Sequence, residues 1–328
     1  MTTHVDIDSA IVPILEAAMR APSSHNTQPW RFRVDDATIH LYADRTRALP
    51  VNDPDDRELA ISCGCALFHL RVAAAAEGLL PQVHLLPDPA DPDLLATVSF
   101  LPAGDEPTPD ASLAEFIDHR HTYRKRFEPR QIPESVLAEL VFAAKAEGAM
   151  LHLMSTEDLR HQVAQLVAEG DAALWANPSW RRELAAWMHP RRRGDGLTVP
   201  WLTGPLTQLV VRTFDMGEGQ GAKDRQIADE SPVLAVLTTS GDVQADWLLA
   251  GQALSRLLLQ ACRHKVQASF LNQPIEIPAL RPKLQNLIGA VGFPQMVIRL
   301  GYIDDRLPVT PRRELHEVME AHAGSQSR

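Results

Sequence analysis

Residues 57–77 read RELAISCGCALFHLRVAAAAE, a run of small and apolar side chains with few charges. Along it Cys63, Leu67, Leu70 and Ala74 recur at the spacing of a helix, so they share one face. The stretch therefore predicts a long helix from about Arg57 to Glu77 whose apolar side is buried.

A second long helix is predicted at DWLLAGQALSRLLLQACR, residues 246–263. At an offset of 187 residues the two helices share a glycine and the apolar positions after it: Gly64 with Gly251, Leu67 with Leu254, Leu70 with Leu257, and Ala74 with Ala261. Helices rich in alanine and leucine also agree by chance. However, both are followed by similar extended stretches, QVHLLPDP (82–89) and QASFLNQP (267–274), which favours an internal repeat.

Shorter segments around the two helices predict strands and further helices. In the first half, a helix ends at Pro22 and four strands are expected at 31–34, 38–43, 82–86 and 97–101, the first two forming a hairpin. In the second half, a helix, a strand buried on both faces and a last strand are expected at 133–148, 231–239 and 295–302. This content predicts an α+β protein.

The two copies are predicted to be residues 1–117 and 118–328, with the Pro-rich acidic stretch 103–110 as a linker. Residues 170–222 have no counterpart in the first copy. This insert holds four tryptophans and two arginine runs: Trp175, Trp180, Trp187, Trp201, Arg181 to Arg182, and Arg191 to Arg193. Because exposed tryptophan is costly, the insert is expected to pack down as a lid or arm.

Composition excludes several classes of protein. The 328 residues carry a formal net charge of −10, which argues against nucleic acid as a partner. Three cysteines are too few for a disulfide framework, and buried free thiols are expected. No signal peptide is recognised, and the apolar stretches are expected to fall short of a membrane span. We therefore expect a cytoplasmic protein with no membrane partner.

Most short motifs have a simpler explanation than a functional site. GEGQGA (217–222) matches the dinucleotide pattern G-x-G-x-x-A, but it leaves too few residues for the crossover helix, which favours a flexible glycine loop. HEVMEAH (316–322) spaces its histidines six apart rather than four, and His119 and His121 are a weak metal pattern. The CGC thiols (63–65) point to different sides of a helix. No metal site is predicted.

The stretch APSSHNTQPW, residues 21–30, carries more hydrogen-bonding side chains than a turn requires. Two basic clusters, RHTYRK (120–125) and TPRRE (310–314), are suited to phosphate binding because guanidinium groups can bind phosphate in a bidentate way. Taken singly, each cluster is more typical of a solvated charged surface than of a site.

Together these stretches resemble the nitroreductase family. APSSHNTQPW resembles its flavin-facing loop, which has the pattern Pro-Ser-x-x-Asn-x-Gln-Pro-Trp. RHTYRKRFEPRQIPESVLAELVFAA (120–144) resembles its opening basic segment and first helix, FLNQPIE (270–276) its Pro-x-Glu stretch, and PVTPRRELHEV (308–318) its phosphate-binding tail. The order of these pieces in one fused chain is similar to the Acg-like FMN-binding subgroup.

The resemblance implies an intramolecular pseudo-dimer of two nitroreductase-like copies, each a mostly antiparallel sheet with helices around a long central helix. Only one complete FMN site can be assembled, because each copy lacks motifs that the other carries. The implied cofactor-binding residues come from both halves: Pro22, Ser23, Ser24, Asn26, Arg120, Thr122, Arg124, Pro274, Ile275, Glu276, and Arg312 or Arg313.

The resemblance also implies a role for each group. Arg120 and Arg312 or Arg313 would neutralise the phosphate, and Arg124 would lie toward the pyrimidine side of the ring. Backbone N–H groups of Glu276 and Ile277 would approach flavin N5, and no catalytic side chain is implied. Lys223 and Arg225 are weaker candidates for the carbonyl end of the ring.

The function implied is an FMN-dependent oxidoreductase with a ping-pong cycle. NAD(P)H would reduce the flavin, and a nitroaromatic, quinone or similar flat acceptor would reoxidise it. Two alternatives stay open: an FMN-storage protein closed by the insert, and a scaffold that no longer binds flavin. The fused halves imply a monomer or a loose homodimer.

Overall fold

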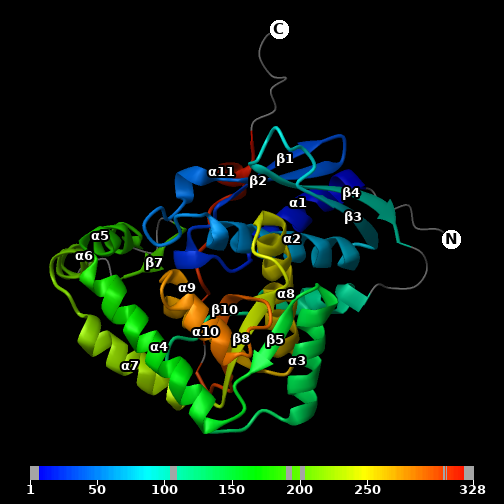
Figure 1. Cartoon of the computed structure of the whole chain (residues 1–328). Coiled ribbons are helices and arrows are strands. Elements are labelled where there is room, and N and C mark those ends of the chain that lie inside the picture. The colour runs from blue at the N-terminus through cyan, green and yellow to red at the C-terminus, as the bar shows by residue number, and fades with distance from the viewer. Residues whose placement is uncertain are drawn as a thin grey trace.

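The computed structural model describes residues 7–103, 109–189, 194–199, 204–305, 307 and 309–320. Two separate four-stranded antiparallel sheets, each with its own helices, make up most of this part of the chain (Figure 1). The predicted α+β class and the pair of mostly antiparallel sheets are confirmed.

The first sheet belongs to the first half of the chain and has the strand order β1-β2-β4-β3. Strands β1 and β2 form the predicted hairpin, in register from Trp30 opposite Ala43 to Asp35 opposite Thr38. The elements of this half are α1 (Ile7–Met19), β1 (Trp30–Asp35), β2 (Thr38–Ala43), α2 (Arg57–Ala76), β3 (Leu79–Leu85) and β4 (Leu94–Pro102), with short 3-10 helices at Ser24–Asn26, Arg45–Arg47 and Pro109–Phe116.

The second sheet has the order β5-β8-β10-β9 and repeats the first one. In both sheets the fourth strand along the chain lies between the second and the third, and the long helix follows the second strand. The main elements are α3 (Glu134–Ala146), β5 (Met150–Leu153), β8 (Val233–Thr239), α8 (Gln244–Arg263), β9 (Gln267–Phe270) and β10 (Phe293–Gly301). The same topology in both halves supports the duplication that the helix alignment predicts.

Helices α2 and α8 pack on each other between the two sheets, with Gly64 against Gly251 (Figure 1). A Cβ atom on Gly64 would lie 2.3 Å from the Leu248 carbonyl oxygen and 3.0 Å from the Gly251 Cα. Only glycine allows two helix backbones to approach this closely. The two residues that the repeat aligns therefore face each other at the centre of the molecule.

Helix α2 is buried on nearly all its sides, and its side chains join the main core together with those of α8. By length and composition alone it could cross a membrane, so the expectation that every apolar stretch is too short is wrong. Within the structure, 89% of its apolar window is buried, as in the core helix of a globular protein.

The insert between β5 and β8 is a helical arm that is wider than the predicted 170–222. It comprises α4 (Glu157–Ala176), α5 (Pro178–Ala186), β6 (Met188–His189), β7 (Leu197–Thr198), α6 (Gly204–Thr213) and α7 (Gly217–Asp229), and it lies to the left in Figure 1. Trp175 and Trp180 are buried and meet edge to face at 5.4 Å. Trp201 and Arg191 to Arg193 lie outside the described residues.

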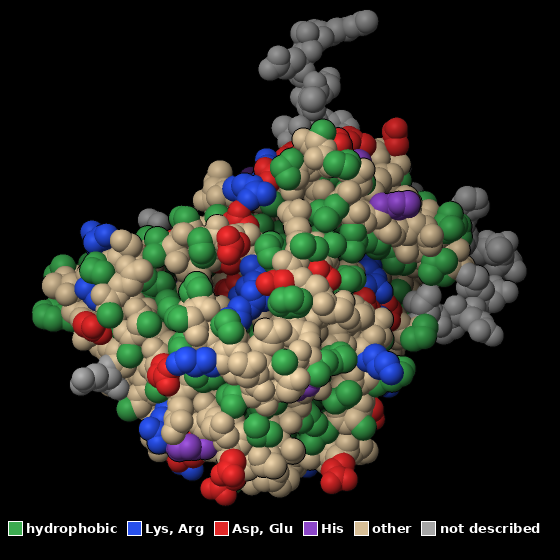
Figure 2. Space-filling model, viewed as in Figure 1, with side chains coloured by type: hydrophobic (Ala, Val, Ile, Leu, Met, Phe, Trp, Pro, Cys, Tyr) green, Lys and Arg blue, Asp and Glu red, His purple; other side chains and the backbone are tan. Residues whose placement is uncertain are grey.

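The prediction of a flexible glycine loop at GEGQGA is wrong, because these residues begin helix α7. A Cβ on Gly217 would lie 3.0 Å from the Trp175 Cβ, and one on Gly221 would lie 3.2 Å from the Ala168 carbonyl oxygen. The glycines therefore bring α7 close to α4. In and just after α6, Leu206, Leu209 and Phe214 are exposed apolar side chains. Hydrophobic side chains also reach the surface at the left end of Figure 2, where the arm lies.

The end of the chain returns to the first half. After α9 (Gln273–Glu276), α10 (Arg281–Leu287) and β10, the tail reaches α11 (Leu315–Val318) beside β1 (Figure 1). The Glu320 N–H donates to the Phe32 carbonyl at 2.8 Å. Residues of the tail that are far from the first loop in sequence are thereby placed next to it.

Replacing Gly64 with alanine is expected to force α2 and α8 apart and to destabilise the fold by about 3 kcal/mol. Urea denaturation should show this as a lower midpoint with little change in slope. The matched control is Gly219→Ala in α7, where a Cβ meets nothing within 4 Å. It should stabilise the protein by about 0.5 kcal/mol through helix propensity. Equal midpoints for the two variants would contradict the proposed packing.

Candidate functional site

A cavity of about 460 Å³ lies where the two halves and the insert meet. Nine of the twelve predicted cofactor-binding residues line it: Pro22, Ser23, Ser24, Asn26, Arg120, Thr122, Arg124, Glu276 and Arg312. Pro274, Ile275 and Arg313 do not. The structure thus gathers residues from both ends of the chain around one space.

Three arginines bring positive charge to one side of this cavity. Arg120 is buried, and burial lowers its pKa to about 10. Its Nη2 donates to the Arg20 carbonyl at 3.2 Å, while its Nε has no partner among the described residues. Burial, and then the charge of Arg120, lower the pKa of Arg312 to about 9. Within the described chain, Arg120, Arg124 and Arg312 form no ion pair with a carboxylate. Unpaired guanidinium groups facing a cavity favour an anionic ligand.

Arg312 and Arg313, which the sequence left as alternatives, have different surroundings. Arg312 reaches the end of α1, where its Nε donates to the Met19 carbonyl at 2.7 Å. Arg313 turns away from the cavity, with its Nη1 3.6 Å from a carboxylate oxygen of Asp44. Only Arg312 is therefore placed to meet a ligand.

The loop that contains Ser24 and Asn26 is strained and is held by the tail and the insert. His25, Asn26 and Gln28 all have positive φ angles, between 49° and 54°. Residues other than glycine rarely adopt this backbone conformation. Asn26 Nδ2 donates to the Pro311 carbonyl at 3.2 Å, and the buried Gln28 accepts from the Arg313 N–H at 3.0 Å. Several of the polar groups of this loop thus hold the tail in place.

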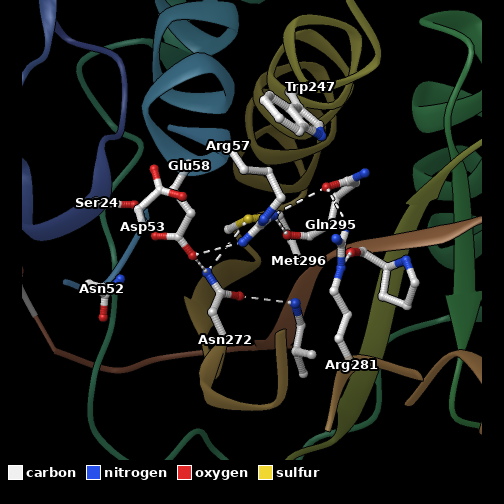
Figure 3. Close-up of polar contacts among 12 residues, drawn as sticks. Ser24, Asn52, Asp53, Arg57, Glu58, Trp247, Asn272, Arg281, Gln295 and Met296 are labelled. Atoms are coloured by element: carbon white, nitrogen blue, oxygen red, sulfur yellow. Dashed lines mark hydrogen bonds and ion pairs between the residues drawn. The ribbon is translucent and has the colours of Figure 1, made fainter. Parts of the chain in front are cut away.

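Buried carboxylates line another part of the cavity. The Glu58 carboxylate accepts from Ser24 Oγ at 2.5 Å and Arg57 Nη2 at 3.1 Å, and Asn272 lies at 3.5 Å (Figure 3). Burial, and then the charge of Glu58, raise the pKa of Glu276 well above its usual range. Burial and the neighbouring Glu58 carboxylate therefore favour the protonated form of Glu276.

Two further carboxylates come from the insert. Gln273 Nε2 donates to Asp171 Oδ1 and to Asp224 Oδ2, each at 3.2 Å. Asp171 is 3% exposed, and burial followed by the charge of Asp224 raises its pKa to about 7. Both residues line the cavity, and together they can hold a proton near neutral pH.

The backbone around α9 differs from the prediction. The Glu276 N–H donates to the Asn272 carbonyl at 3.0 Å, and the Ile277 N–H donates to the Gln273 carbonyl at 3.3 Å. Both groups are therefore engaged in the helical turn rather than free for a ligand. Of the two weaker candidates, Lys223 lines the cavity, and Arg225 lies 3.9 Å from Asp229.

Comparison with known proteins gives the family. A family model described as "Putative TM nitroreductase" matches residues 1–74. The Mycobacterium tuberculosis H37Rv protein "Putative NAD(P)H nitroreductase Rv3131" is 34% identical over 328 residues, which cover 98% of this chain and 94% of the relative. The chain belongs to the nitroreductase family. "Putative NAD(P)H nitroreductase acg" of the same strain is 31% identical over 98% of this chain and 97% of its own.

Among solved structures, the FMN-dependent nitroreductase NfnB of Mycobacterium smegmatis, in complex with NADPH, covers 65% of this nitroreductase and is itself covered over 99% of its length. The sequence identity is 18% and the TM-score is 0.43.

Sequence analysis of this nitroreductase missed several groups that line the cavity. His25 is one, and burial lowers its pKa to about 4, so a neutral imidazole faces the cavity. Asp171 and Asp224 are two more, and no local motif signals them because they lie far apart in the sequence, on two different helices. No group of metal ligands is found among the described residues. All three cysteines are buried and form no disulfide bond.

The raised pKa of Asp171 has a consequence for stability. Between pH 4 and about 7 the folded protein holds a proton at this site that the unfolded chain releases. Folding stability is therefore expected to fall as the pH rises through this window. Asp171→Asn should remove the fall and make the variant the more stable protein above pH 7.

Urea unfolding at pH 5 and pH 8 measures this effect as the difference between wild type and variant. The control is Glu169→Gln, an exposed carboxylate on the same helix paired with Lys283. A wild type and an Asp171→Asn variant with parallel pH dependences would contradict a raised pKa.

Proposed function

We propose that this protein is an FMN-dependent NAD(P)H oxidoreductase of the nitroreductase type. The observation that carries the proposal is that Arg120, Arg124 and Arg312, from both ends of the second half, line one cavity and form no ion pair with a carboxylate among the described residues. Guanidinium groups that face a cavity without a carboxylate favour an anion beside them, most of all the buried Arg120, and the FMN phosphate supplies one.

The cavity fits FMN in size and in chemistry. Its volume of about 460 Å³ is within the ordinary range for cofactor sites. The unpartnered Arg120 Nε provides a donor that nothing else in the described chain uses. Away from the arginines the lining includes apolar groups such as Leu254, Leu271 and Met296, against which a flat ring can lie.

Each part of the site then has a role. Arg120 and Arg312 hold the phosphate, and Arg124 adds positive charge near the ring. Bound FMN supplies hydride chemistry, and the protein positions it and excludes water. Trp175 and Trp180 of the insert line the cavity, and NAD(P)H and then a flat nitroaromatic or quinone acceptor bind beside them in alternation.

We also propose that the two copies meet at residues 117 and 118, and that the chain works as a monomer in the cytoplasm. The α2 and α8 contact already joins two nitroreductase-like halves within one chain. Such a chain needs no second copy to complete its cavity. The cytoplasm is where NAD(P)H is available.

FMN storage is the second candidate function, and the docking of the insert favours it. Trp180 Nε1 donates to Asn52 Oδ1 at 2.7 Å, and the Glu183 carboxylate accepts from the N–H groups of Val51 and Asn52, each at 2.9 Å. These contacts fasten α5 to the loop before α2. An insert held closed would keep NAD(P)H away from bound FMN.

Arg312→Ala and Arg120→Ala are each expected to weaken FMN binding roughly ten- to a hundredfold, the worth of one charge-assisted hydrogen-bond partner. Titration of the flavin-free protein with FMN, followed by flavin fluorescence, measures this. The control is Arg126→Ala, which removes an exposed arginine outside the cavity that pairs with Glu230. Wild-type protein that takes up no FMN would overturn the proposed function.

The variant Glu183→Ala distinguishes the two candidate functions, an oxidoreductase and an FMN-storage protein. For an oxidoreductase, NADPH or NADH added without oxygen should bleach the flavin bands of wild type and variant alike. A store predicts wild-type bands that persist until Glu183→Ala releases the insert. Dithionite, which is small, should bleach both proteins and serves as the control for a reducible flavin.

A further inference from the structure

Asp171 and Asp224 form a carboxyl pair in the wall that the insert contributes to the cavity. Asp171 lies on α4 and Asp224 on α7, and both line the cavity. Gly221 lets the two helices approach, since a Cβ there would lie 3.4 Å from the Asp171 Cβ. The amide of Gln273 bridges the two carboxyl groups, with its Nε2 3.2 Å from an oxygen of each.

The hydrogen bonds of the pair leave room for a proton. Asp171 is 3% exposed, yet its Oδ2 has no partner among the described residues, and neither has Gln273 Oε1. Two acceptors without donors are costly inside a protein. One proton on the carboxyl pair supplies the missing donor and also removes the repulsion between two buried negative charges.

The charged groups around the pair come from several elements. Glu276 on α9 also lines the cavity, and burial, then the charge of Glu58 and, to a smaller extent, that of Asp171 raise its pKa. Arg299 on β10 is 2% exposed and is attracted to Asp224, while Lys223 on α7 and Glu58 on α2 also line the cavity. Gln220 Nε2 donates to Asp224 Oδ1 at 2.9 Å. Asp224 thus accepts hydrogen bonds from Gln220 and Gln273, whereas Asp171 Oδ2 has no partner among the described residues.

We propose that Asp171 and Asp224 hold one proton in the cavity wall and deliver it to the acceptor as the acceptor is reduced. This inference rests on the proposed oxidoreductase function. For a quinone acceptor the overall change is NAD(P)H plus quinone plus one proton giving NAD(P)+ plus hydroquinone. The hydride of NAD(P)H brings two electrons and one hydrogen. The second hydrogen is the proton of the pair, which then takes a proton from water.

The placement of the pair suits this role. Its carboxyl groups sit on the insert, the same part of the cavity as Trp175 and Gln220, and not among the arginines that hold the phosphate. An acceptor beside the insert is therefore within reach of the proton. A group that donates a proton works best when its pKa lies near the working pH, and the pKa of Asp171, raised to about 7, meets this condition.

The test separates the two half-reactions in stopped-flow experiments with the FMN-loaded protein. Asp171→Asn and Asp224→Asn should lower the rate of quinone reduction roughly a hundredfold, the usual worth of a proton donor. Flavin reduction by NAD(P)H should stay within about twofold of wild type, because hydride delivery to the protein needs no proton from the pair. The control is Glu169→Gln on the outer side of α4.

A second measurement does not depend on turnover. Infrared spectra of flavin-free wild type at pH 6 should show the C=O stretch of a buried protonated carboxyl, which weakens in Asp171→Asn and persists in Glu169→Gln. The inference is overturned if quinone reduction is unchanged in both variants, if both half-reactions fall equally, or if the band does not differ between Asp171→Asn and wild type. Wild-type protein that takes up no FMN would overturn the proposed function and the proton delivery together.

Discussion

The close contact between Gly64 and Gly251 is the constraint on which the rest of the structure depends. It sets the distance between α2 and α8, and a Cβ on Gly251 would lie 2.1 Å from the Ile61 carbonyl oxygen. The two helices carry the two sheets, so this distance also fixes how the halves face each other. The cavity, lined by Ile61 and Cys65 of α2 and by Leu254 of α8, lies alongside this same contact.

Because the chain is a repeat, the cavity has an equivalent position elsewhere in the molecule, and ion pairs occupy that position. Cys65 lines the cavity, and its counterpart in the repeat is Gln252, which accepts from Arg71 Nη1 at 2.8 Å. There Arg71 and Arg256 both pair with Glu147, at 2.6 Å and 2.7 Å. Arginines at this position are thus neutralised by carboxylates of the protein, whereas Arg120, Arg124 and Arg312 pair with no carboxylate in the part of the chain that the structure describes. The contrast explains in physical terms why one site is open to an anionic ligand.

Local patterns predicted the elements well, and long-range packing decided what they missed. The hairpin, both long helices and the buried strands follow from local apolar patterns, which depend only on neighbouring residues. GEGQGA was misjudged because its glycines serve the contact between α7 and α4, which no local pattern encodes. The Asp171 and Asp224 pair was missed for the same reason, since the two residues meet only when those helices pack. The resemblance to the family predicted the arginines, but only the structure distinguishes Arg312 from Arg313.

The carboxyl groups and the arginines of the cavity also constrain each other. Glu58, Glu276, Asp171 and Asp224 all line the same space, and four full negative charges there would repel a phosphate and cancel the arginines that attract it. Protonation lessens the conflict, since burial raises the pKa of Asp171 to about 7 and also raises the pKa of Glu276, which favours the uncharged form of both. The same burial that makes an anionic cofactor acceptable therefore leaves a proton stored beside it, and the site gains a proton donor from the condition that lets it bind phosphate.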